Sequence, residues 1–98
     1  MTSTLPTQEQ VDLIAAELAP DVVRIRLRIG LDSTDDPAMF FKVTLSDEAS
    51  RRDRRSAVTR RVREVVAEKL GLDQFEHFPY FRFRSASEQA VLRDESWA

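Results

Sequence analysis

The chain has 98 residues, no cysteine, one histidine and a net charge of −2. This length fits one domain and leaves no room for a second core, and the lack of cysteine excludes disulfides, thiolate catalysis and cysteine-bound metal sites. No apolar run reaches the roughly 20 residues of a membrane span and no signal-peptide core follows Met1, so we expect a cytoplasmic protein without membrane contact.

A first helix is predicted to follow residues 1–6, which are small and polar and are expected to be flexible. Thr7 is its predicted N-cap, and Gln10, three positions later, completes the pattern of a capping box. Pro20 is expected to end this helix. The apolar residues that recur at helical spacing and predict a buried face are Val11, Ile14, Ala15 and Leu18.

The segment at about 22–30 alternates apolar residues with arginine, which is typical of a strand because successive side chains point to opposite faces. The apolar set, predicted to face a core, is Val23, Ile25, Leu27 and Ile29. The opposite face carries Arg24, Arg26 and Arg28. After a turn-rich acidic loop, a second strand is predicted at about 38–45. It directs Met39, Phe41, Val43 and Leu45 inward and Phe40, Lys42 and Thr44 outward.

Ser46 is predicted to cap a long helix that ends at Gly71. Its buried stripe is Val58, Val62, Val65, Val66 and Leu70. The first turns, around Arg51–Arg55, have no apolar face and are expected to project past the core.

A third strand, at about 79–84, buries Phe81 and Phe83 and exposes Tyr80, Arg82 and Arg84. Ser85 is predicted to cap a short final helix, and residues from about 93 to 98 are expected to be flexible.

The element order αββαβ(α) indicates an α+β fold, a single two-layer domain over residues 1–98. Strands joined by a loop are expected to be antiparallel, and a helical crossover makes the second and third strands parallel. The predicted sheet is three-stranded and mostly antiparallel, in the order 2-1-3, with the helices on one face.

The other sheet face is the candidate binding face. Its predicted residues are Arg24, Arg26, Arg28, Lys42, Tyr80, Arg82 and Arg84. One interpretation is a solvated face, or one neutralised by the acidic residues near the C-terminus, Glu88, Asp94 and Glu95. Another is a partner protein that supplies carboxylates. A third is single-stranded nucleic acid, with arginines on phosphates and Tyr80 and Phe40 as stacking platforms.

Three further features are candidate sites. Asp32, Asp35 and Asp36 suit a hard cation, but they lack the EF-hand pattern and are common turn residues, so no metal is predicted. His77 has no local nucleophile or second base, so we predict no catalytic residue, no cofactor and no enzyme. Trp97 is a candidate anchor by which the tail folds back or docks into a partner.

From the loop onward, three stretches carry a likeness to known proteins. They are residues 35–48, which contain Asp36-Pro37 and Phe40-Phe41, then the run Phe78-Pro79-Tyr80-Phe81-Arg82-Phe83-Arg84-Ser85, and then Ser87-Glu88-Gln89-Ala90. Over roughly residues 22–98 the chain resembles a family of small uncharacterised bacterial proteins, often encoded beside a HEPN-domain protein. The resemblance implies a possible partner or neutraliser role, as in toxin–antitoxin pairs, and supplies no catalytic residues.

The element order and the Pro-x-Phe-x-Phe type of final strand also resemble the KH-like ribosome-binding factors, whose Gly-x-x-Gly loop and strongly basic charge are missing here. We therefore predict a non-catalytic protein-interaction module that uses the basic sheet face. It would bind a neighbouring gene product or self-associate, for instance as a dimer. The alternative is a single-stranded RNA- or DNA-binding module with a KH-like element order.

Overall fold

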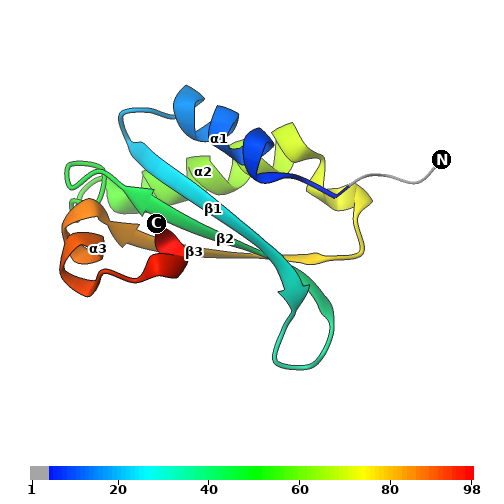
Figure 1. Ribbon diagram of the computed structural model, residues 1–98. Coiled ribbons are helices and arrows are strands. Elements are labelled where there is room, and N and C mark those ends of the chain that lie inside the picture. The colour runs from blue at the N-terminus through cyan, green and yellow to red at the C-terminus, as the bar shows by residue number, and fades with distance from the viewer. Residues whose placement is uncertain (1–4) are drawn as a thin grey trace.

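The computed structural model describes residues 5–98 and has eight elements in chain order. They are α1 (Gln8–Glu17), β1 (Val22–Leu31), β2 (Pro37–Leu45), α2 (Arg55–Leu70), the 3-10 helix η1 (Leu72–Gln74), β3 (Phe78–Ser85), α3 (Ala86–Leu92) and the 3-10 helix η2 (Glu95–Trp97). The predicted α+β class and the three strands are confirmed (Figure 1). Part of the predicted flexible start, residues 1–4, lies outside the described residues.

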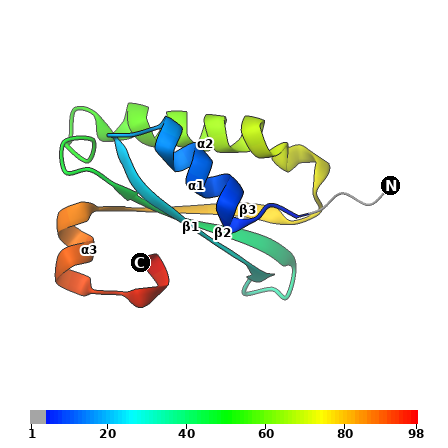
Figure 2. The ribbon, with the colours of Figure 1, turned by 45° about the horizontal axis from the view of Figure 1, so that its top comes forward.

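The sheet separates two unequal layers. Figure 2 shows α1 and α2 on one side, and α3 with the C-terminal end of the chain on the other. We call the side toward α1 and α2 the inner face and the opposite side the outer face. Among the described residues, no helix is long and apolar enough to cross a membrane.

The predicted strand order is wrong: the strands lie in the order β1-β2-β3, with β2 in the centre. β1 pairs antiparallel with β2, and β3 pairs parallel with β2, so the sheet is mixed rather than mostly antiparallel. The predicted directions of both strand pairs agree with the structure. The predicted order does not, because the helical connection after β2 brings β3 directly beside β2, with no strand between them. Burial explains why β2 lies in the centre, because a central strand is covered by a neighbouring strand on each edge. β2 supplies five fully buried apolar residues, Ala38, Met39, Phe41, Val43 and Leu45.

The predicted start of the long helix is also wrong. α2 begins at Arg55, and residues 46–54 form turns instead. Residues 46–54 have no apolar stripe that a helix could bury, and polar contacts hold these turns in place. Arg54 donates two hydrogen bonds to Asp21, at 3.2 and 2.9 Å. The carboxylate of Asp47 accepts from the backbone and the hydroxyl of Ser87.

The core forms between the inner face and one stripe of each long helix. α1 buries Val11, Ile14 and Ala15, and α2 buries Val58, Val62, Val66 and Leu70, as the helical spacing predicts. An irregularity in the β1–β2 register between Val22 and Arg24 makes Val22, rather than Val23, the buried residue. Val23 is therefore 53% exposed, which corrects its predicted inward position.

Long side chains cover part of both free sheet edges. On β1, the amide of Gln8 accepts from the backbone N–H of Leu27 at 2.9 Å and donates to the carbonyl of Ile25 at 2.7 Å. On β3, Arg55 donates to the carbonyl of Phe83 at 3.3 Å. These contacts satisfy backbone groups that would otherwise offer a pairing template to another strand.

Candidate binding face

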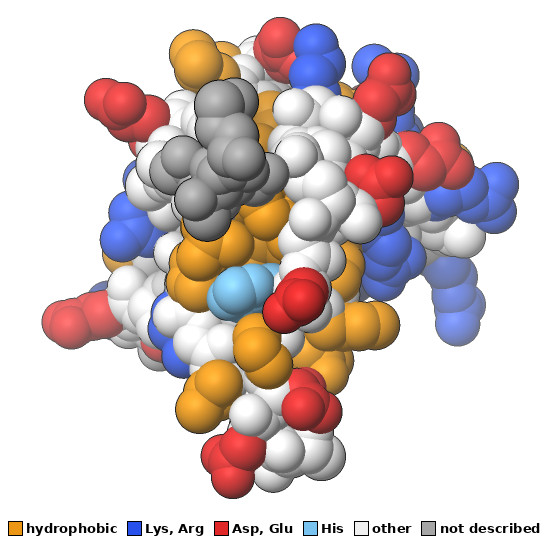
Figure 3. Space-filling view, turned by 90° about the vertical axis from the view of Figure 1, so that its right-hand side faces the viewer, with side chains coloured by type: hydrophobic (Ala, Val, Ile, Leu, Met, Phe, Trp, Pro, Cys, Tyr) orange, Lys and Arg blue, Asp and Glu red, His pale blue; other side chains and the backbone are white. Residues whose placement is uncertain are grey.

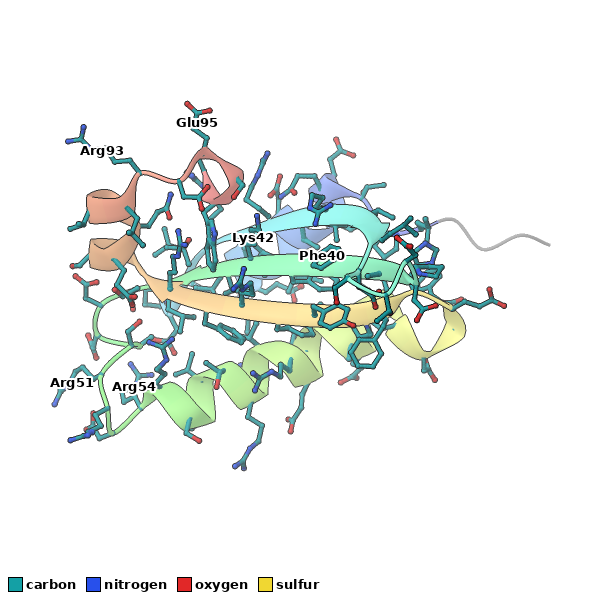
Figure 4. All side chains as sticks on the ribbon, turned by 90° about the horizontal axis from the view of Figure 1, so that it is seen from below. Phe40, Lys42, Arg51, Arg54, Arg93 and Glu95 are labelled. Carbon is teal, nitrogen blue, oxygen red and sulfur yellow. The ribbon has the colours of Figure 1, made fainter. Side chains whose placement is uncertain are left out.

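Three rows of polar and aromatic residues run across the outer face, because cross-strand partners lie on the same side of a sheet. Each row takes one residue from β1, β2 and β3 in turn. The aromatic row is Arg28, Phe40 and Tyr80; the cation row is Arg26, Lys42 and Arg82; and the tail row is Arg24, Thr44 and Arg84. All seven residues predicted for the binding face thus belong to one surface. Figure 4 shows Phe40 and Lys42 along β2, with Lys42 nearer the C-terminal end of the chain.

The aromatic row is a stack of its own side chains. The guanidinium of Arg28 lies 4.2 Å from the centroid of the Phe40 ring. On the opposite side, Tyr80 stacks on Phe40 with ring centroids 5.5 Å apart and an interplanar angle of 15°. Phe78 packs against Tyr80 at 4.8 Å between centroids. Both π faces of Phe40 are therefore occupied within the protein.

The aromatic end of the face borders an acidic loop. The hydroxyl of Tyr80 donates to Asp32 at 2.9 Å, and this bond raises the pKa of Tyr80 above its usual value. Figure 3 shows this end of the molecule, with hydrophobic side chains gathered around the single histidine and acidic groups nearby. An anionic ligand is thus disfavoured at this end and favoured at the cation row.

The cation row places three like charges side by side. Arg26 and Arg82 are exposed, and neither takes part in an ion pair within residues 5–98. Lys42 is half-buried and donates to the hydroxyl of Ser96 at 2.7 Å. Like charges on adjacent strands repel, so this arrangement favours a ligand that brings negative charge.

The C-terminal residues cover the tail row. Asp94 pairs with Arg84 at 3.5 Å, and the Arg84 guanidinium lies 4.3 Å from the centroid of the Trp97 ring. Trp97 is only 3% exposed, and Thr44 is 5% exposed. η2 contacts both β1 and β2, so Trp97 folds back on its own sheet, one of the two predicted alternatives for it. Residues 93–98, expected to be flexible, are in contact with the domain here.

The predicted acidic neutralisers behave differently from one another. Asp94 reaches the outer face, whereas Glu88 pairs with Arg55 at 3.9 Å, and Glu95 points away from the sheet (Figure 4). The hydrogen bond from the Ser96 side chain is the main cause of a lowered pKa at Asp94, and the charge of Arg84 adds to it.

The arginine-rich run before α2 lies outside this face. Arg54 pairs with Asp21 and Glu48, and Arg51 pairs with Asp53. Within α2, Glu64 forms no ion pair with Arg60 or Arg61 among the described residues. Arg63 instead lies 5.1 Å from the Phe83 ring centroid.

The other two candidate sites are the acidic loop at Asp32–Asp36 and His77. Asp32, the first residue of the acidic loop, accepts from Thr34 and Asp36 and closes the turn, while within the described chain no group of three metal-ligating side chains is found. His77 is half-buried and makes no hydrogen bond or ion pair within residues 5–98.

No family model, no curated protein and no solved structure is significantly similar to this chain. The predicted resemblance to a HEPN-associated family therefore stays a prediction.

Two contributors to the face were missed at the sequence level. Ser96 is not among the predicted residues, although Asp94-x-Ser96 is a pattern in which the carboxylate accepts from the backbone N–H two positions later, as it does here at 3.0 Å. Phe78 lies one position before the third strand predicted at about 79–84. It begins β3 and is 60% exposed beside Tyr80, and its place before the alternating Tyr80–Arg84 run was the available indication.

Proposed function

We propose that the protein is a non-catalytic interaction module whose outer face binds an acidic segment of another protein. The observation that carries this proposal is the cation row, in which exposed Arg26 and Arg82 flank Lys42 and form no ion pair within residues 5–98. Arginine suits such a role because its planar guanidinium binds carboxylates through two parallel hydrogen bonds. A chain with a net charge of −2 that concentrates cations here is suited to steering an acidic partner to this face.

The protein's own C-terminal residues support the choice of a peptide ligand. An aspartate, a serine and a tryptophan from one short segment all contact cations of the outer face. These contacts show one way in which a peptide with acidic and aromatic residues can pack on the outer face.

Single-stranded RNA or DNA is the second candidate, because the same cations suit phosphates. Stacking of bases on Phe40 is disfavoured, since Arg28 and Tyr80 already cover its two faces. Nucleic acid would therefore bind through its backbone and with a steep dependence on salt.

The first test is co-expression with the neighbouring gene product that the resemblance implies. The tagged protein is purified in three forms: wild type, Arg26→Glu/Arg82→Glu, and the control Arg52→Glu/Arg60→Glu. The control changes the net charge equally at exposed arginines outside the outer face. We expect co-purification with the wild type and the control, and loss with the outer-face variant. Absence of co-purification, or equal loss in both variants, would contradict a role for this face in binding that partner.

A binding assay separates the two ligand classes. Fluorescence anisotropy is measured for labelled deca-glutamate and for a labelled mixed-sequence RNA oligonucleotide, at low and near-physiological salt. Binding of the acidic peptide that is lost in Arg26→Glu/Arg82→Glu supports the proposal. Salt-sensitive binding of RNA alone, lost in the same variant, would replace it with the second candidate.

A further inference from the structure

The tail, defined as Asp94–Trp97, contacts two cations of the outer face, Lys42 of the cation row and Arg84 of the tail row. Asp94 meets Arg84 at 3.5 Å, and Ser96 accepts from Lys42 at 2.7 Å. The Trp97 ring lies under the Arg84 guanidinium, at 4.3 Å from its central carbon. Lys42 and Arg84 are half-buried as a result, whereas Arg26 and Arg82 remain exposed.

The tail packs on the outer face and lies outside the core. Trp97 is buried, yet it packs on the outer face and does not belong to the core cluster between the sheet and the two long helices. Arg93, which joins the tail to α3, has a φ of 52°, so the chain turns sharply there. One further link is Gln89, which donates to the carbonyl of Asp94 at 2.7 Å. Release of the tail would therefore expose Trp97 without opening the core.

We propose that the tail is an internal competitor, and that an acidic partner segment displaces it from Lys42 and Arg84. This inference rests on the proposed function, since it concerns access to the same face. In the free protein the chain's own Asp94–Trp97 segment occupies Lys42 and Arg84, and in the complex the partner's acidic segment occupies them.

Tethering makes the tail a strong competitor for the outer face. A ligand joined to its receptor by a short linker is present at an effective concentration in the millimolar range. A partner binds the full face only in the fraction of molecules whose tail is released, so its apparent affinity falls by that fraction. Weakening the tail must therefore tighten the binding of the partner.

The test uses the full chain and deca-glutamate as the probe. Trp97 is the only tryptophan, so its emission reports the tail alone. Unlabelled deca-glutamate is expected to shift the Trp97 emission to longer wavelength and to increase its quenching by acrylamide. Labelled deca-glutamate is expected to bind Asp94→Asn about threefold more tightly than wild type, because that variant loses one partly exposed ion pair.

Glu95→Gln is the matched control. It removes the same charge one position away, at a side chain that points away from the sheet (Figure 4), so its affinity should match that of the wild type. Binding with unchanged Trp97 emission, or equal tightening in Asp94→Asn and Glu95→Gln, would overturn the displacement and leave the proposed function standing. No binding of deca-glutamate to any form at low salt would overturn both.

Discussion

At the scale of single residues, Asp32 organises the loop between β1 and β2. Its carboxylate accepts from the hydroxyl and backbone of Thr34, from the backbone of Asp36 and from the hydroxyl of Tyr80. The Thr34 hydroxyl, the largest contributor, and the other donors lower the pKa of Asp32 from 3.8 to about 2. Asp32 therefore closes this loop and holds the hydroxyl of Tyr80 in the aromatic row.

Replacement of Thr34 by Val removes the strongest of these donors and should raise the pKa of Asp32 toward its usual value. Carbon-detected NMR titration of the Asp32 carboxyl measures this directly, with Ser33→Ala as the control in the same loop. Because the pKa is lower in the folded state, the contribution of Asp32 to stability is present above pH 3.8 and lost as the pH falls toward about 2. An unchanged pKa in Thr34→Val would contradict the assigned role of Thr34.

Phe41 and Phe78 offer a matched pair for measuring burial. Phe41 is fully buried on β2 and stacks on Phe81 with centroids 4.9 Å apart, while Phe78 is 60% exposed. We expect Phe41→Ala to lower the free energy of unfolding by about 3–5 kcal/mol, and Phe78→Ala by less than about 1 kcal/mol. Urea unfolding followed by far-UV circular dichroism gives both values. Similar losses at the two positions would contradict the placement of β2 at the centre.

At the scale of elements, the edge of β1 is the feature most open to test. The Gln8 amide holds the N–H of Leu27, so this amide is protected although β1 is an edge strand. Gln8→Ala should speed hydrogen exchange at Leu27 selectively. Gln10→Ala, which instead removes the side-chain half of the α1 capping box, should leave the Leu27 rate unchanged. Equal exchange in both variants would show that the Gln8 contact does not protect the strand.

Local features of these elements could be predicted from the sequence, and non-local ones could not. The capping boxes of α1 and α3 depend on pairs three positions apart, Thr7 with Gln10 and Ser85 with Glu88, and both caps form with their predicted residues. Strand order depends on which strand has neighbours on both edges. A short stretch of sequence does not contain that information. The observed start of α2 differs from the predicted one because Ser46, although it caps a turn, is followed by no apolar stripe until Val58.

In the candidate site, too, the local features were predictable from the sequence and the non-local ones were not. Alternation along β1 and β3 predicts that Arg24, Arg26 and Arg28 share a face with Arg82 and Arg84, and the register places all five together. The cover over Thr44 and Arg84 comes from residues far along the chain, so alternation contains no information about it. Charge alone favoured Glu88, Asp94 and Glu95 equally, yet only Asp94 is directed to the face by its turn.

At the scale of the whole molecule, the two faces of the sheet differ in how they are covered. The inner face is closed by two helices over a continuous apolar core, while the outer face is closed only at one end by α3 and the tail (Figure 2). Stability should therefore be unevenly distributed between the two sides.

This difference predicts two separate transitions in urea. Trp97 fluorescence, which reports the tail, should change at a lower urea concentration than far-UV circular dichroism, which reports the whole fold. Arg84→Ala should move the fluorescence midpoint further down, because Arg84 contacts both Asp94 and Trp97. Coincident midpoints for both probes would mean that the tail unfolds together with the core.

The parallel pairing of β2 with β3 also sets an order of assembly. Every pair of partners in it lies 40 positions apart, as Ala38 and Phe78 do, whereas β1 and β2 are joined by a short loop. Closing a long loop costs more entropy than forming a hairpin, so we expect the hairpin to form first. Until β3 arrives, the most apolar strand of the protein has one open edge. The step that completes the outer face is thus the same step that ends this aggregation-prone interval.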